Sequence, residues 1–189
     1  MWLMALALGT GAAQAKDGAR DGFGISLSTE VFTPFLGGFH AEAGVGWGKN
    51  RFSVSTTWIE RPSFYTPGNA FSEYRRYLDV HYTRFILSKG QRGLNVGGGV
   101  TYFYDVDVTD TDTNEAQENS GFTRIALRLG FVWFPSKKIG LFVEPAIVAG
   151  IALGTQDIDF TDTSTYNPGL PDISGPLLLV GWRFGAPGK

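Results

Sequence analysis

Alternation of apolar and polar residues is the dominant pattern of this 189-residue chain. The segment FHAEAGVGW, Phe39 to Trp47, has an apolar side chain at every second position and small or polar residues between. Successive side chains of a β-strand point to opposite faces, so period two predicts strands with one apolar and one polar face. The pattern predicts eight strands, at residues 23–31, 39–47, 52–58, 78–86, 94–106, 125–133, 141–153 and 178–184.

The connections between these segments alternate in length. Short turns are expected at 48–50, 88–93 and 135–140, and longer connections at 60–73, 109–121 and 155–175, while the first connection, near 34–38, is brief. The short turns contain lysine and arginine without acids, whereas 105–118 and 155–174 contain acids without bases. An up-and-down meander with two unlike ends follows from this arrangement.

Side-chain volume indicates which face of the predicted barrel is apolar. The interior of an eight-stranded barrel is only wide enough to be filled by side chains. The apolar face carries four tryptophans and many other large residues, which would overfill that interior, whereas the other face is rich in glycine and serine. We therefore predict an all-β fold, an eight-stranded antiparallel up-and-down transmembrane β-barrel. A soluble periplasmic β-sandwich, which buries its apolar faces between two sheets, is the alternative.

Aromatic residues of the apolar face gather near the strand ends. Two aromatic belts, one at each interface of the bilayer, are typical of membrane barrels, and a sandwich gives no reason for such sorting. The predicted interface aromatics are Phe23, Trp47, Phe52, Trp133, Trp182 and Phe184 near the short turns, and Trp58, Tyr102 and Tyr104 toward the long loops.

The first fifteen residues, MWLMALALGTGAAQA, are uncharged and end in the small-x-small sequence Ala13-Gln14-Ala15. They predict an N-terminal signal peptide at 1–15, followed by a single barrel domain at 16–189. The absence of cysteine excludes disulfides and thiolate zinc sites, and a formal net charge of −2 gives no basic surface for nucleic acid. We expect no cofactor.

The chain resembles the small eight-stranded outer-membrane proteins typified by OmpA and OmpX. The resemblance covers the eight strands, the short turns and a final strand, LLLVGWRFG, similar to the terminal strand by which such barrels are recognised for assembly, although four residues follow it here. It implies an exported, monomeric protein of a Gram-negative outer membrane, with long loops outside the cell. Its implied partners are outer-membrane lipid, lipopolysaccharide and the outer-membrane assembly machinery.

The inward face collects ionisable residues, which must be paired because burying an isolated charge is costly. Pairing across the 135–140 turn places Glu144 diagonal to Arg128, so we expect a salt bridge, with Arg183 as a second candidate partner. The predicted lumen network comprises Glu30, His40, Glu42, Asp79, His81, Arg124, Arg128, Glu144 and Arg183. A paired network would close the lumen; a small pore is the alternative.

Catalysis is the other alternative. Asp79-x-His81 and His40-x-Glu42 each place a carboxylate and an imidazole on one face, and some outer-membrane barrels are lipid A acyl hydrolases built on Ser, His and an acid. Neither histidine stands in a His-x-Ser sequence, and both face the predicted lumen rather than lipid. We therefore predict no catalytic residues.

The acidic loop at 105–112 offers oxygen ligands for calcium but lacks the glycine and the closing glutamate of an EF-hand, so we predict no metal site. Phe160 and Tyr166, isolated in the last long loop, are expected to pack within it, the alternative being a role as contact residues at a surface site.

Two residues conflict with the outward apolar face. Arg84 requires a position near the short-turn interface or a nearby bulge, and Pro145 removes a ladder hydrogen bond. We expect a bulge or local distortion at Glu144–Pro145.

Overall fold

The computed structural model describes residues 22–62, 70–87, 90–118, 121–135, 139–155, 157–161, 164–166 and 172–185. The predicted signal peptide at 1–15 lies outside these ranges. Within them, no helix is long and apolar enough to cross a membrane.

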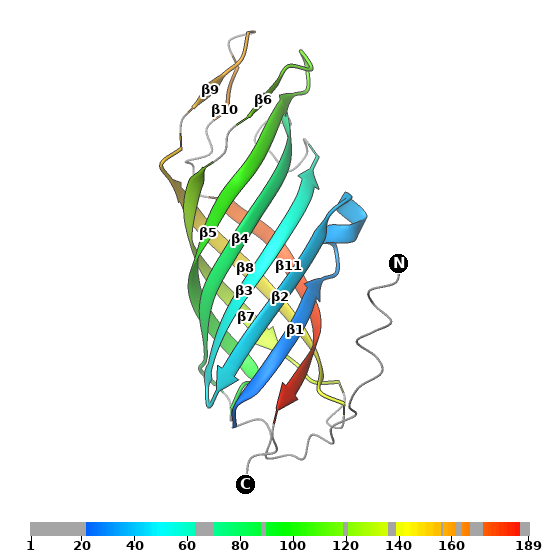
Figure 1. Cartoon of the computed structure of the whole chain (residues 1–189), viewed down its shortest axis with the longest axis vertical. Coiled ribbons are helices and arrows are strands. Elements are labelled where there is room, and N and C mark those ends of the chain that lie inside the picture. The colour runs from blue at the N-terminus through cyan, green and yellow to red at the C-terminus, as the bar shows by residue number, and fades with distance from the viewer. Residues whose placement is uncertain are drawn as a thin grey trace.

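Eight antiparallel strands form a closed ring, as predicted (Figure 1). Each strand pairs with its neighbour in the chain, and the ring closes between the first and the last. A two-sheet sandwich is therefore excluded. The wall strands are β1 (Gly24–Glu30), β2 (Phe39–Trp47), β3 (Asn50–Arg61), β4 (Phe71–Phe85), β5 (Gly93–Asp110), β7 (Phe122–Val132), β8 (Leu141–Leu153) and β11 (Asp172–Gly185).

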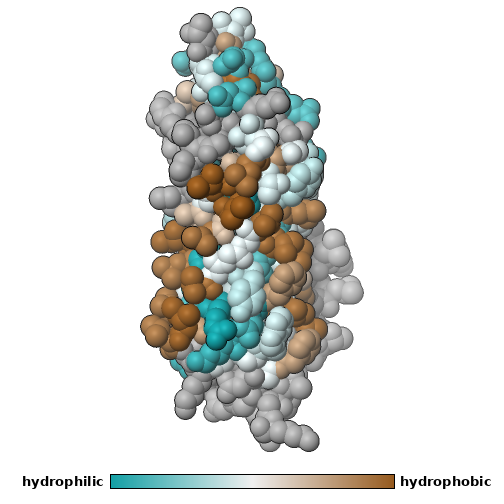
Figure 2. All heavy atoms as spheres, turned by 90° about the vertical axis from the view of Figure 1, so that its left-hand side faces the viewer, coloured by the Kyte–Doolittle hydropathy of each residue, from teal (hydrophilic) through white to brown (hydrophobic). Residues whose placement is uncertain are grey.

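Alternation along each strand separates the two faces of the wall. On β7, every second residue from Phe122 to Val132 is buried, and Ile125, Leu127, Leu129 and Phe131 between them are exposed. Figure 2 shows hydrophobic side chains over the barrel wall on the face it presents, and mainly hydrophilic residues at the loop end. The large apolar side chains thus line the outside of the ring.

A bulge changes this alternation in the upper part of β5. Tyr77 of β4 faces Phe103, but Arg76 faces Asp105, so Tyr104 has no residue opposite it. One extra residue moves the following side chains to the other face. Val106, which the sequence pattern places outward, is consequently fully buried.

Above the bulge, β4 and β5 continue beyond the rest of the wall and carry a small apolar core (Figure 1). The short strands β6 (Ala116–Glu118), β9 (Ile158–Asp159) and β10 (Thr165–Tyr166) lie at this end. We call this part the outer cap; its buried residues are Phe71, Phe103, Val106, Val108, Phe122, Ile158, Phe160 and Tyr166. Phe160 stacks on Phe71 and Tyr166 meets it edge-on, so both loop aromatics belong to this core.

Pro145 is accommodated without the predicted bulge. It faces Leu178 of β11 in continuous register. On the other side, the ladder to β7 stops beside Pro145 and resumes at Trp133 and Val143, which exchange two backbone hydrogen bonds of 2.8 Å. Hydrogen-bonded pairs recur at every second residue, so Pro145 stands where its missing N–H would have donated to β7. The strand loses a ladder bond and keeps its register.

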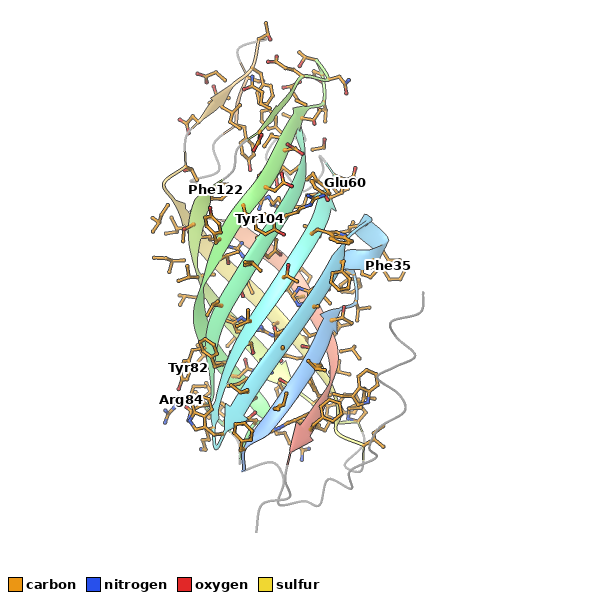
Figure 3. All side chains as sticks on the ribbon, viewed as in Figure 1. Phe35, Glu60, Tyr82, Arg84, Tyr104 and Phe122 are labelled. Carbon is orange, nitrogen blue, oxygen red and sulfur yellow. The ribbon has the colours of Figure 1, made fainter. Side chains whose placement is uncertain are left out.

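Arg84 lies at the short-turn end, opposite Asn50 of β3, and its side chain is exposed there (Figure 3). The register of β4 against β5 is continuous at Arg84 and Phe85, so no bulge is involved. A long side chain at this level can extend to the interface.

Candidate functional site: the barrel lumen

The lower half of the lumen is filled by ion pairs centred on Glu144 of β8. Arg51 of β3 donates two parallel hydrogen bonds to it, Nη1 to Oε2 at 2.8 Å and Nη2 to Oε1 at 2.9 Å. Asn95 of β5 adds a third, at 3.3 Å, and Glu144 is fully buried. A bidentate guanidinium and further donors are what a buried carboxylate needs to offset its desolvation.

Arg128 of β7 connects Glu144 to a second carboxylate. Its Nη2 lies 3.0 Å from Glu144 Oε1, and its Nη1 lies 3.3 Å from Glu42 Oε2 on β2. The ion pair between Arg128 and Glu144 forms, but not through the expected diagonal register. Arg128 stands opposite Val148, four positions from Glu144, and its long side chain spans the difference. Alternating charges then cross the lumen from β3 through β8 and β7 to β2. We call Arg51, Glu144, Arg128 and Glu42 the lumen network.

A histidine–aspartate pair adjoins the lumen network. His81 Nδ1 lies 2.8 Å from Asp79 Oδ2, and Thr101 donates to the other oxygen of Asp79 at 2.7 Å. Nε2 of His81 lies 2.8 Å from Arg128 Nη1, which can donate a hydrogen bond but cannot accept one. His81 therefore donates from Nδ1 to Asp79 and accepts at Nε2, so the lone pair that a general base needs is engaged.

Apolar side chains pack in the lumen below the network. Phe85, Val132 and Phe142 are buried together near the short turns, with Phe134 packed against them. The Arg51 guanidinium lies 5.7 Å from the centre of the Phe85 ring, so the ionic and apolar layers are in contact. The described lumen therefore contains an ionic layer and an apolar layer in succession.

The other predicted lumen residues have separate roles. Glu30 accepts hydrogen bonds from the backbone N–H and the hydroxyl of Thr33 and from the Leu178 N–H, so it joins backbone segments rather than a guanidinium. Arg124 lies 5.7 Å from the centre of the Phe103 ring, higher in the lumen. Arg183, the second candidate partner of Glu144, lies instead at the short-turn end, where it donates to the Gly22 carbonyl at 3.3 Å.

Sequence reasoning missed several members of the lumen network and its surroundings. Arg51 follows the 48–50 turn directly and has the inward parity of Ser53, so counting back by two would have found it. Asn95 has the inward parity of β5 but no charge to mark it. Higher up, Glu73 pairs with Arg61 at 3.1 Å and with Arg75 at 2.6 Å, in a part of β4 that was expected to be loop.

A cavity of about 350 Å³ remains between the lumen network and the outer cap. Glu42, His81 and Arg128 form its inner end and Phe103 lies at its outer end. His40 of β2 also lines it, with Nδ1 2.8 Å from the Thr57 hydroxyl.

All nine predicted interface aromatics have exposed side chains. Trp47 and Phe52 flank the β2–β3 turn, whereas Trp58 pairs with Phe39 toward the loop end, their ring centres 5.4 Å apart. The wall therefore carries aromatics at both levels.

No group of three or more His, Cys, Asp or Glu side chains suited to a metal occurs in the described ranges. The acidic segment at 105–112, expected as a loop, is strand as far as Asp110, the last residue of β5, which receives hydrogen bonds from Thr113, Asp112 and Ser164. These bonds lower the pKa of Asp110, the Thr113 backbone contributing most. In the outer cap, burial raises the pKa of Tyr166 to about 12.

No protein-family model matches the chain, and no curated protein sequence matches it. The solved structures similar to it include the crystal structure of Neisserial surface protein A (NspA), with a TM-score of 0.43 and 10% identical residues, covering 87% of this chain and 94% of that chain. A likeness this distant assigns no family, so the function is argued from the chain's own geometry.

Proposed function

We propose that this chain is an integral outer-membrane β-barrel protein that is not catalytic, with a lumen closed to ions and an outer cap exposed at the cell surface. Its role is then membrane integrity or interaction at the surface. Its partners are outer-membrane lipid and lipopolysaccharide, and it reaches the membrane as a monomer through the assembly machinery.

The observation that carries this proposal is the distribution of apolar and charged groups across the wall. Ionised side chains are buried in the lumen, whereas large apolar side chains such as Ile125, Leu129, Ile147 and Ile151 cover the outside. Soluble monomers rarely expose contiguous apolar patches of more than a few hundred Å². Lipid is the solvent in which this outer surface is favourable.

The ionic and apolar layers of the lumen favour a plug over a pore. Each charge of the lumen network has an opposite partner within 3.3 Å, and an apolar layer lies beneath. An ion entering the lumen would have to break these pairs in surroundings of low dielectric constant. Against a hydrolase stands the engagement of both His81 ring nitrogens by Asp79 and Arg128.

Heating tests membrane insertion. A refolded barrel in detergent or vesicles is expected to migrate differently on a gel when unheated and when boiled, and to stay in the membrane fraction after alkaline extraction.

Planar bilayers containing the folded protein are expected to carry no steady current, and lipid A from expressing cells is expected to keep all its acyl chains. A protein that is soluble without detergent would refute the proposal. A steady current would contradict the closed lumen, and loss of an acyl chain from lipid A would contradict the absence of catalysis.

A further inference from the structure

On the long-loop side, the barrel wall is shortest at β1 and β2. Pairing of β1 with β11 ends at Glu30 and Leu179, followed by one backbone hydrogen bond from Val31 to Leu178. Pairing of β2 with β3 begins only at Phe39 and Trp58. The part of β11 before Leu178 and the end of β3 after Trp58 therefore rise beside a gap. Figure 1 shows β1 and β2 ending below the tall β4 and β5.

The connection across this gap is a 3-10 helix, η2 (Thr33–Leu36), which forms the lower edge of the opening. Glu30 fixes it there: one carboxylate oxygen accepts from Thr33 and the other from the N–H of Leu178 on β11. We call this opening the side notch. Its edge is held by a buried carboxylate, and it is therefore a defined part of the fold.

Residues on both sides of the side notch line the lumen cavity. Its lining includes Phe32 and Leu36 beside η2, Ile59 of β3, and Pro176 and Leu177 of β11, from both flanks of the gap. Phe32 and Pro176 are also exposed. Much of the lining near the notch is thus apolar, at the level of the Phe39–Trp58 pair, although Thr33 of η2 and Arg61 of β3 also line the cavity.

The far end of the cavity is polar, with charges already matched. Glu42 pairs with Arg128, and Asp79 with His81 and Thr101. The buried polar atoms without a hydrogen-bond partner among the described residues include Nε2 of His40 and Oε1 of Glu42 at this end, and also Nε and Nη2 of Arg128. The His40 and Glu42 atoms lie on the same face of β2, two positions apart.

These two atoms suit an uncharged hydroxyl-bearing group. When the Thr57 hydroxyl donates to His40 Nδ1, the proton is on Nε2, which can donate to a ligand oxygen. Oε1 of Glu42 accepts a hydroxyl hydrogen. A charged group would have to disrupt an existing ion pair, which is costly in a buried site.

We propose that the side notch admits a single-chain amphiphile from the outer leaflet, with an uncharged hydroxyl head bound at His40 and Glu42 and a hydrocarbon tail passing along the apolar lining near the notch into the membrane. The inference rests on the proposed membrane insertion. A cavity of about 350 Å³ lies within the usual range of ligand pockets, about 300–1,000 Å³, and holds the head rather than the whole molecule.

The test uses the full mature chain in phosphatidylcholine nanodiscs, after the gel shift has verified the folded barrel. A monolauroylglycerol with a photoreactive head is cross-linked at increasing concentration, and unlabelled monolauroylglycerol, laurate and dodecylamine compete. Saturable labelling of one site per barrel is expected, at peptides lining the cavity, with monolauroylglycerol the best competitor.

Two variants and one control locate the site. Ala126→Leu adds bulk to a cavity-lining side chain of β7 and should reduce labelling at least tenfold. Ala149→Leu makes the same change on the outer face of β8, opposite Leu127, and should leave labelling unchanged. His40→Phe keeps a ring but removes the Nε2 donor, and should weaken competition by monolauroylglycerol about three- to tenfold.

Labelling that survives Ala126→Leu, or that never saturates, would mean ordinary lipid contact with the outer wall and would overturn the inference. Better competition by laurate or dodecylamine would overturn the uncharged head. A folded, inserted barrel without labelling overturns this inference alone, whereas a chain that does not insert overturns the proposed function and this inference with it.

Discussion

Arg51 and Glu144, 93 positions apart in the chain, meet across the lumen through two hydrogen bonds of 2.8 and 2.9 Å. They come from β3 and β8, which are not neighbours in the ring. Their contact therefore links opposite parts of the wall, in addition to the strand-to-strand ladders.

Removing the charge of Glu144 is expected to destabilise the barrel strongly. Glu144→Gln leaves Arg51 buried without its anion, and breaking a buried pair costs about 3–5 kcal/mol. Arg51→Met should cost a similar amount, and the double variant should cost clearly less than the sum of the two. Urea unfolding of the folded barrel in detergent measures the coupling; additive losses would show that the two side chains act independently.

Opening the lumen is expected to require the loss of both layers. Glu144→Ala alone should carry no steady current in a planar bilayer, because Phe85, Val132 and Phe142 still close the lumen beneath it. Phe142→Ala alone should also remain closed, since the lumen network is intact. Only the double variant, once its gel shift shows that it folds, should conduct; conduction by either single variant would contradict two layers that each close the lumen.

Gly181 is predicted to be indispensable to the packing of the apolar layer. A Cβ built on Gly181 would lie 2.8 Å from Cζ of Phe142 and 2.3 Å from the Leu27 carbonyl oxygen. Gly181→Ala should therefore destabilise the barrel by about 1–3 kcal/mol, the usual cost of overpacking. Gly98→Ala, whose Cβ would meet its nearest neighbour at 3.5 Å, is the control and should change stability little. Equal effects in urea unfolding would count against the packing argument.

The arrangement of the wall was predictable because each strand alternates with period two. Parity places Glu144 on the face opposite the large apolar residues, and the volume of those residues together with the sorting of the aromatics then indicates a closed ring with Glu144 inside. Arg51 was missed because it stands next to a turn, where the strand pattern had only begun. Its partnership with Glu144 depends on distance across the lumen, and strand parity contains no information about that distance.

The outer cap could not be predicted by the same reasoning. The bulge at Tyr104 depends on the register between β4 and β5, and the alternation changes face there without any glycine or proline to mark it. At Pro145, where a bulge or a local distortion was expected, the structure has an interrupted ladder and no bulge. The rule that proline disrupts a ladder is correct, but losing one bond does not require a shift of register.

Truncating the core of the outer cap is expected to loosen the loops and spare the barrel. Phe160→Ala removes a buried ring stacked on Phe71, so the cap should open more often and be cleaved faster by a protease that cuts after acidic residues, which both cap loops contain. The gel shift of the barrel should be unchanged. Phe35→Ala is the matched control, since Phe35 on η2 is 82% exposed and projects away from the wall (Figure 3). Comparable cleavage of both variants would contradict a packed cap.

Acid is expected to loosen the outer cap through Asp110. Hydrogen bonds from Thr113, Ser164 and Asp112 lower its pKa below the ordinary value of 3.8. A carboxyl whose pKa is lower in the folded state stabilises it fully above the unfolded pKa, and this stabilisation is lost as pH falls through the folded pKa. Protection of the cap amides from hydrogen exchange, corrected for intrinsic rates, should therefore hold at pH 5 and fall below about pH 3.8, the ordinary value. Asp110→Asn still accepts hydrogen bonds but does not titrate, so its protection should depend less on pH; an unchanged pH dependence would assign the effect to another group.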